Sequence, residues 1–159
     1  MNLNRLSTFR GAGKLNVDFA NDVIKDVVIV QEGEAKGHGV WLDSKFINDI
    51  AKQGASLSGI KSRFGHPNMC GNSLGDYLGE FQNFSSRRQL GKMQAIADLH
   101  LDRSIADKSP KYDKSLTDYI LQFASTKPEM FGNSIVFSGT QEERKVESEE
   151  GKKVMRNFM

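Results

Sequence analysis

The hydrophobic positions of the chain fall into short strand-like runs and two longer stretches with helical spacing. Strands are expected at residues 23–30, 58–65, 77–84, 93–101 and 134–138. The first of these runs is rich in β-branched residues, which is typical of a buried strand. In the run at 93–101 every second position is apolar, which indicates a strand with one face on a core. A polar turn at residues 85–91 is expected to join the third and fourth strands.

Two segments have the apolar spacing and the end signals of α-helices. Residues 43–53 begin with two candidate N-cap residues, Asp43 and Ser44. Residues 110–126 carry a proline in the first turn and end before Pro128. Together with the strands, these helices predict an α+β fold that is mainly β.

The chain divides into three parts by composition. Residues 1–22 are polar and contain glycine, which predicts a loose N-terminal arm with room for one short strand. Residues 23–140 hold all the expected strands and both helices, and they are predicted to form a single domain. Residues 141–159 are rich in charge and predict either an exposed hairpin around Gly151 or a flexible tail.

The length of 159 residues favours one domain with a sizeable core. With 38% hydrophobic and 26% charged residues, the composition is that of a globular protein and not of a disordered one. The formal net charge of +2 is too small to indicate a nucleic-acid-binding protein. The chain has no long apolar run that predicts a membrane span and no signal peptide at its start. The single cysteine, Cys70, excludes an intrachain disulfide, so we expect a reducing cytoplasm.

A histidine and a serine at the edges of two expected strands are the candidate catalytic residues. His66 follows one strand directly, and Ser134 opens another strand after Gly132 and Asn133. A serine becomes a nucleophile when a base removes its proton, and imidazole can take and return a proton near neutral pH. The two side chains need to be close only in the fold. Each also has a structural interpretation, His66 as a strand-end histidine and Ser134 as a strand-edge hydroxyl.

The order of motifs over residues 26–138 resembles that of the tailed-phage prohead proteases, which are relatives of the herpesvirus assemblins. The motifs are His66-Pro67, then Leu74-Gly75-Asp76-Tyr77-Leu78-Gly79, a strand, a helix, and Asn133-Ser134-Ile135-Val136-Phe137. In that family a histidine at a strand end precedes a Leu-Gly strand start, and a Ser-Ile-Gly-Phe-like strand carries the nucleophile. Val136 stands where many members have glycine.

The resemblance implies an assemblin-like, mostly antiparallel β-barrel flanked by helices. It implies a serine endopeptidase of capsid maturation, with Ser134 as the nucleophile and His66 as the general base. The implied substrates are scaffold protein, capsid-protein extensions or the protease itself, cut inside an assembling prohead in the host cytoplasm. Self-association as a dimer or larger assembly is also implied. No cofactor, metal ion, nucleic acid or membrane is expected to take part.

The sequence leaves the identity of the third catalytic group open. In assemblins it is a second histidine on a later strand, whereas the last histidine of this chain, His100, precedes Ser134. Asp98 and Asp76 are acidic candidates for orienting His66, and Asp98 equally fits a solvent-facing strand position. The third group could also come from elsewhere, or the chain could be a truncated or self-processed product.

The remaining chemically versatile residues give weaker hypotheses. His38 fits a surface turn or a binding loop, and His100 fits the surface of a strand. Cys70 lies too near His66 along one loop for a nucleophile and its base to adopt the required geometry. These residues lack the usual ligand-pair spacing, so no metal site is expected. Lys61 is a further candidate as the partner of a Ser-Lys dyad.

Two other classes of function stay open. A non-catalytic capsid assembly or scaffolding protein could keep the same fold with an incomplete triad, and the missing third group favours it. A binding domain with an unrelated β-rich fold would place His66 and Ser134 far apart.

Overall fold

The computed structural model describes residues 3–10, 14–35, 40–65, 75–109, 114–138, 142–147 and 153–158. In chain order the elements are β1 (Leu3–Arg10), β2 (Asn16–Asp18), β3 (Val23–Gln31), β4 (Gly33–Ala35), β5 (Val40–Leu42), α1 (Ser44–Ala55), β6 (Ile60–Phe64), β7 (Asp76–Gln89), β8 (Lys92–Leu101), α2 (Arg103–Ala106), α3 (Leu116–Thr126), β9 (Gly132–Ser138), β10 (Glu142–Glu147) and β11 (Lys153–Phe158).

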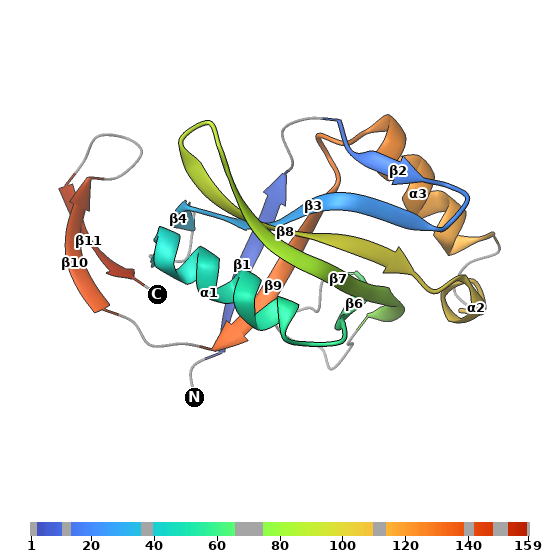
Figure 1. The fold of residues 1–159 in the computed structure, drawn as a ribbon, viewed down its shortest axis with the longest axis horizontal. Coiled ribbons are helices and arrows are strands. Elements are labelled where there is room, and N and C mark those ends of the chain that lie inside the picture. The colour runs from blue at the N-terminus through green and yellow to red at the C-terminus, as the bar shows by residue number, and fades with distance from the viewer. Residues whose placement is uncertain are drawn as a thin grey trace.

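These strands pair into three sheets (Figure 1). The largest sheet has the order β2-β3-β8-β7-β6, the second has the order β10-β11-β5-β4, and β1 pairs with β9. Among the described strand pairs, only β11 with β5 is parallel. The predicted α+β, mainly β fold is therefore confirmed. The described pairings form three sheets and do not by themselves close into a ring.

The core lies on one face of the largest sheet, against both main helices. The alternation predicted for β8 is confirmed only in part, because Gln94 and Ile96 on its other face are also buried. The side chains on its inward face are buried as expected: Ala95, Ala97, Leu99 and Leu101. One cluster of buried apolar side chains joins β3, β7 and β8 to α3, and a second joins α1 and β5 to the start of β8. Ile135 of β9 packs against both clusters. The two predicted helices thus cover the two ends of one sheet face.

Helix α1 forms where the sequence predicts it. The Asp43 carboxylate accepts a hydrogen bond of 2.8 Å from the backbone N–H of Phe46, which satisfies a free donor of the first turn. Near the end of the helix, Gly54 lies against the Phe84 ring of β7. A Cβ atom at Gly54 would lie only 2.3 Å from that ring, so glycine is required for this close packing.

The second main helix begins later than predicted. Helix α3 starts at Leu116 because Ser115 caps it, its hydroxyl accepting a 3.0 Å hydrogen bond from the N–H of Asp118. The predicted start at Pro110 lies outside the described residues, which resume at Lys114. The predicted end before Pro128 is confirmed. The short helix α2 was not predicted.

The β7–β8 hairpin is longer than the sequence suggests. The expected turn at residues 85–91 is wrong, because strand pairing continues to Gln89 opposite Lys92. The turn consists of Leu90 and Gly91, with φ angles of 49° and 76°. Positive φ at both central positions is the pattern of a type I′ hairpin. Pairing across the hairpin overrides the weak strand propensity of the polar residues.

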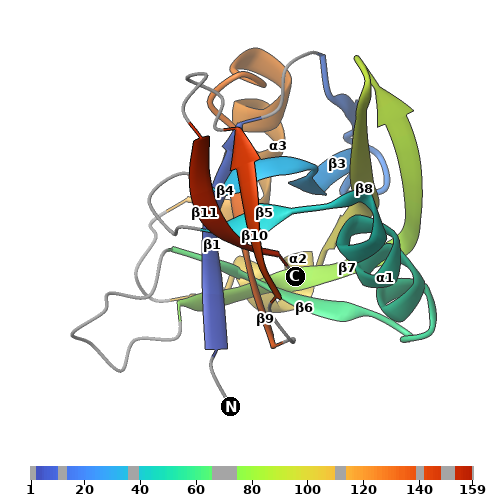
Figure 2. The same cartoon turned by 90° about the vertical axis from the view of Figure 1, so that its left-hand side faces the viewer.

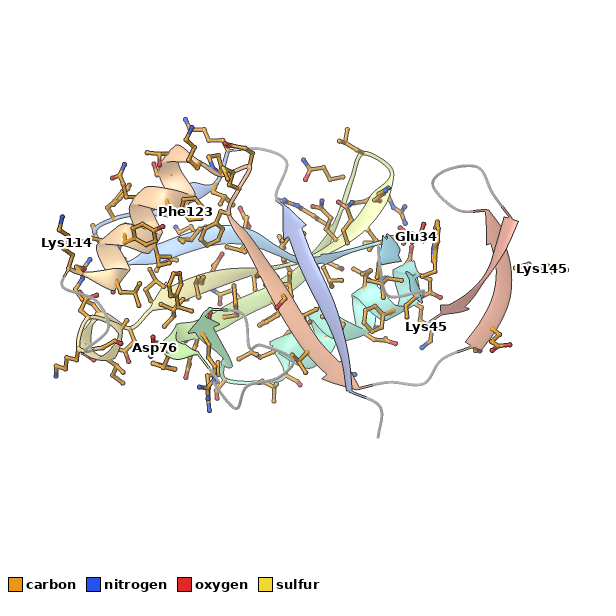
Figure 3. All side chains as sticks on the ribbon, turned by 180° about the vertical axis from the view of Figure 1, so that it is seen from behind. Glu34, Lys45, Asp76, Lys114, Phe123 and Lys145 are labelled. Atoms are coloured by element: carbon orange, nitrogen blue, oxygen red, sulfur yellow. The ribbon has the colours of Figure 1, made fainter. Side chains whose placement is uncertain are left out.

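The N-terminal segment is not a loose arm over residues 3–10. These residues form β1, which pairs with β9 from Leu3 opposite Ser138 to Arg10 opposite Gly132. Pairing satisfies backbone groups that the polar sequence alone would leave to water. Figure 3 shows the β1–β9 ribbon lying across the largest sheet.

The charged C-terminal segment forms a hairpin, as one of the two alternatives predicted. Strands β10 and β11 pair from Glu142 opposite Phe158 to Glu147 opposite Lys153, while Gly151 lies outside the described residues. Figure 2 shows this hairpin in front of the body of the molecule. It joins the rest through β11, whose Asn157 and Phe158 pair with β5.

Candidate functional site

Ser134 lies on the exposed side of β9. Successive side chains of a strand point to opposite faces. Asn133 and Ile135 are half-buried and point toward the sheet and the core, whereas Ser134 and Val136 are exposed, Val136 by 53%. The predicted nucleophile therefore lies on a strand and faces outward.

Asn133 holds this part of β9 against the largest sheet. Its side-chain amide donates a hydrogen bond of 2.7 Å to the backbone carbonyl of Val28 in β3. The two neighbours of Ser134 thus fix β9, Asn133 by this hydrogen bond and Ile135 by apolar packing. The sequence analysis assigned no role to Asn133, and its position next to the serine was the only signal that could have drawn attention to it.

His66 lies outside the described residues, together with Pro67 and Cys70. The strand before it, β6, ends at Phe64, and Gly65 follows with φ at 99°. Phe64 pairs with Asp76 at the start of β7, so the segment that carries His66 leaves and rejoins the sheet at one edge. The assignment of His66 as general base stays a prediction.

A row of aromatic rings connects the end of β6 with the start of β9. Phe64 meets Tyr119 of α3 edge-on at 6.4 Å between ring centroids. Tyr119 stacks on Phe123 at 6.1 Å, and Phe123 contacts Phe131 at the same centroid distance. Phe64 stands two positions before His66, and Phe131 stands three positions before Ser134. The end of β6 and the residue before β9 are therefore joined through α3.

Asp98 is engaged in holding two irregular strand positions. One carboxylate oxygen accepts a 3.0 Å hydrogen bond from the backbone N–H of Asp26, and the other accepts a 2.9 Å bond from the side-chain amide of Asn83. Asp26 and Asn83 have φ angles of 57° and 55° and lie where the registers of β3 and β7 shift against β8. These contacts assign Asp98 a structural role. Asp76, the other acidic candidate, lies beside Phe64 at the sheet edge.

Two further candidates, His100 and Lys61, lie on β8 and β6 of the largest sheet, and His38 lies outside the described ranges. His100 was expected on a strand surface, but it is half-buried on β8, opposite Glu80 and Val23. Within the described part of the chain its Nε2 atom has no hydrogen-bond partner. Lys61 is exposed on β6, and His38 is outside the described residues.

An ion cluster around Arg103 was not predicted from the sequence. The Arg103 guanidinium donates two hydrogen bonds to Asp22, at 2.9 and 2.7 Å, and one of 2.8 Å to Asp118. It also lies 3.4 Å from the Asp107 carboxylate, which accepts a bond of 2.8 Å from the Ser115 hydroxyl. The cluster fastens α2 to the β2–β3 turn and to the start of α3. Arg103 and Asp107 are an i,i+4 pair that a local pattern can show, whereas Asp22 lies 81 positions away in the sequence, so its contact could not be predicted.

Two carboxylates of this cluster, Asp107 and Asp118, are stabilised in their charged form. The hydrogen bond from Arg103, helped by that from Ser115, lowers the pKa of Asp118 below 3.8. Burial alone would raise the pKa of Asp107, but hydrogen bonds from Thr117 and Ser115 outweigh it and lower this pKa as well. Hydrogen bonds to Asp22 and Asp118 raise the pKa of Arg103. The lowered pKa values of Asp107 and Asp118 favour their charged forms, which suits a role in stability rather than in proton transfer.

The described residues show no metal centre and no long apolar helix. In these ranges no group of three or more acidic, histidine or cysteine side chains is placed to bind a metal ion. No helix in them is long and apolar enough to cross a membrane. Comparison of the chain with family models, with curated proteins and with solved structures finds no match.

Proposed function

We propose that the chain is a serine endopeptidase of capsid maturation, with Ser134 as the nucleophile and His66 as the general base. The observation that supports this most is the placement of Ser134. Its hydroxyl lies on the exposed face of a strand that is fixed by Asn133 and Ile135 on the other face. A nucleophile needs such rigid support together with access for the substrate.

The chemistry follows from the two residues. Ser134 Oγ attacks the carbonyl carbon of the peptide bond while His66 takes the hydroxyl proton. When the tetrahedral intermediate collapses, the carbon–nitrogen bond breaks and His66 returns the proton to the leaving amine. Water then attacks the acyl-enzyme, with His66 again removing and returning a proton, and Ser134 is released unchanged.

The resemblance to prohead proteases supplies the biological part of the proposal. The substrates are scaffold protein, capsid-protein extensions and the protease itself, inside an assembling prohead in the host cytoplasm. The proposed fold is the assemblin-like barrel with flanking helices, in a chain that self-associates. The packing of Ile135 of β9 against both apolar clusters of the largest sheet is compatible with that fold.

A non-catalytic capsid assembly or scaffolding protein is the second candidate. One observation favours it: the carboxylate of Asp98, an acidic candidate for the third catalytic group, accepts its hydrogen bonds from Asp26 and Asn83. In that case Ser134 is a surface serine without special reactivity.

Labelling with a fluorophosphonate probe separates the two candidates. The protease requires labelling of the wild-type chain at Ser134, identified by mass spectrometry, and loss of labelling in Ser134→Ala and His66→Ala. The matched control is Ser86→Ala, which removes another exposed strand serine and leaves labelling unchanged. An unlabelled wild-type chain, or labelling that survives His66→Ala, contradicts a serine activated by this histidine.

A further inference from the structure

A β-bulge of β1 lies directly opposite Ser134. The register of the β1–β9 pair shifts between Leu6 and Phe9, whose partners in β9 are the two neighbours of Ser134. Ser7 and Thr8 together therefore oppose the single position of Ser134. Two residues opposite one is the arrangement of a bulge, and it leaves the extra residue outside the regular hydrogen-bond ladder. The backbone beside the proposed nucleophile thus has one more N–H group than the ladder needs.

A second bulge shows what such a group does in this protein. The register of β3 against β8 shifts between Ile24 and Val27, so Lys25 and Asp26 together oppose Asp98. The backbone N–H of Asp26 donates a hydrogen bond of 3.0 Å to a carboxylate oxygen of Asp98. The residue opposite this bulge therefore places a negatively charged oxygen on a bulge N–H.

At the β1 bulge, the reaction itself would supply the charged oxygen. When Ser134 Oγ bonds to the carbonyl carbon of a peptide bond, one electron pair of the C=O bond moves to the carbonyl oxygen, which becomes an oxyanion. This oxyanion is attached to the side chain opposite the bulge, one bond further from Cβ than a carboxylate oxygen of Asp98 is. Acyl transfer requires hydrogen-bond donors at that oxygen, and backbone N–H groups commonly fill this role.

We propose that a backbone N–H of the bulge at Ser7 and Thr8 is an oxyanion donor for acyl transfer at Ser134. This inference rests on the proposed protease function and adds a donor to the catalytic pair. Ser134 is exposed, while Asn133 and Ile135 fix β9 from its other face. Paired strands lie about 4.8 Å apart, so the bulge backbone is close enough to meet a group bonded to Ser134 Oγ.

Removal of the bulge tests this assignment. Deletion of Thr8 leaves one residue opposite Ser134 and restores a regular ladder, with Leu6 and Phe9 opposite their present partners. The deletion variant is expected to keep its urea midpoint and to react with a fluorophosphonate about 100-fold more slowly than the wild type, the loss of one oxyanion donor. In the labelled wild type, the amide proton of Ser7 or Thr8 should move downfield in ¹⁵N NMR spectra, because it donates to the phosphonyl oxygen. A folded deletion variant that reacts at the wild-type rate overturns the assignment.

Proline variants test the same group if the deletion variant does not fold. Ser7→Pro and Thr8→Pro each remove one backbone N–H and keep the residue count, and an edge strand such as β1 tolerates proline. One of the two is expected to slow labelling about 100-fold. The matched control is Asn4→Pro, which removes an N–H opposite Phe137 and leaves the rate unchanged. Equal rates in all three variants overturn the assignment, and slow labelling of Ser7→Ala or Thr8→Ala overturns it in favour of a hydroxyl donor.

Failure of this assignment and failure of the protease give different results. A wild-type chain that is labelled at Ser134, at a rate that none of the bulge variants lowers, supports the protease and overturns the oxyanion donor. A wild-type chain that is not labelled contradicts both.

Discussion

The cluster around Arg103 and the exposed side of β9 both present polar groups at the surface, but they differ in what holds those groups. Around Arg103, charged side chains are bonded to one another and thereby fix α2, α3 and the β2–β3 turn. On β9, the strand is fixed by Asn133 and Ile135, which point inward, while Ser134 lies on the opposite, outward side. We infer that changes in the first region affect stability and that changes at Ser134 affect activity.

The largest expected effect is on catalysis at β9. Ser134→Ala should lower peptide cleavage at least about 1,000-fold, because the nucleophile is lost. Its free energy of unfolding should stay within about 0.5 kcal/mol of the wild type, since the side chain is exposed. Urea unfolding and cleavage of a capsid-protein substrate check the two parts. A strongly destabilised variant would show that Ser134 is a structural residue.

The second-largest expected effect is a loss of stability in the cluster around Arg103. Arg103→Ala removes the cation that pairs with Asp22, Asp107 and Asp118. The Arg103 side chain is 41% exposed, so solvent screening limits the expected loss to about 1–2 kcal/mol. Arg103→Lys, which keeps the charge but not the planar fork, should lose less. Fluorophosphonate labelling at Ser134 should persist in both variants below the unfolding transition; its loss would show that the two regions are not separate.

Acid should weaken the same cluster. Hydrogen bonds from Arg103 and Ser115 lower the pKa of Asp118, and hydrogen bonds that outweigh burial lower the pKa of Asp107. The unfolded chain therefore binds more protons than the native state when the pH falls below the usual carboxyl pKa of 3.8. As a result, the free energy of unfolding decreases as the pH drops through the lowered pKa values of Asp107 and Asp118. Urea midpoints measured between about pH 5 and pH 2.5 should fall in the wild type and fall less in Arg103→Ala. Equal acid sensitivity of the two proteins would mean that Arg103 does not set these pKa values.

A smaller effect is expected at Asp98. Replacement by alanine leaves the Asp26 N–H and the Asn83 amide without their acceptor and should cost about 1 kcal/mol of unfolding free energy. If Asp98 only holds the two strand irregularities, the rate of fluorophosphonate labelling is unchanged. A large drop in that rate, with the fold intact, would instead identify Asp98 as the group that orients His66.

The smallest effect is expected at the tip of the β7–β8 hairpin. Leu90 has φ at 49° and is 93% exposed, so it has an unfavourable backbone conformation and little packing. Leu90→Asn should raise the unfolding free energy by about 0.5–1 kcal/mol, because Asn-Gly suits a type I′ turn. Thermal unfolding measures this gain, and a destabilised variant would show that Leu90 makes a contact that matters.

The sequence predicts the elements whose signals are local. The cap at Asp43 and the stop at Pro128 each act within a few residues, and the structure confirms them. The elements that were missed depend on distant partners. Strand β1 exists because it pairs with β9, and the Arg103 cluster joins residues from three separate elements. The prediction of Ser134 comes from its local motif and stays a prediction, whereas Asn133 gains its structural role only from a contact with β3.

The most direct test of the account is the distance between His66 Nε2 and Ser134 Oγ in a crystal structure of the whole chain. The account predicts a distance of about 3 Å, or up to about 4 Å in a resting site, with a further group behind the imidazole. A separation of more than about 10 Å, with the two side chains in unrelated surroundings, would contradict the protease. The chain would then be a β-rich structural or binding domain.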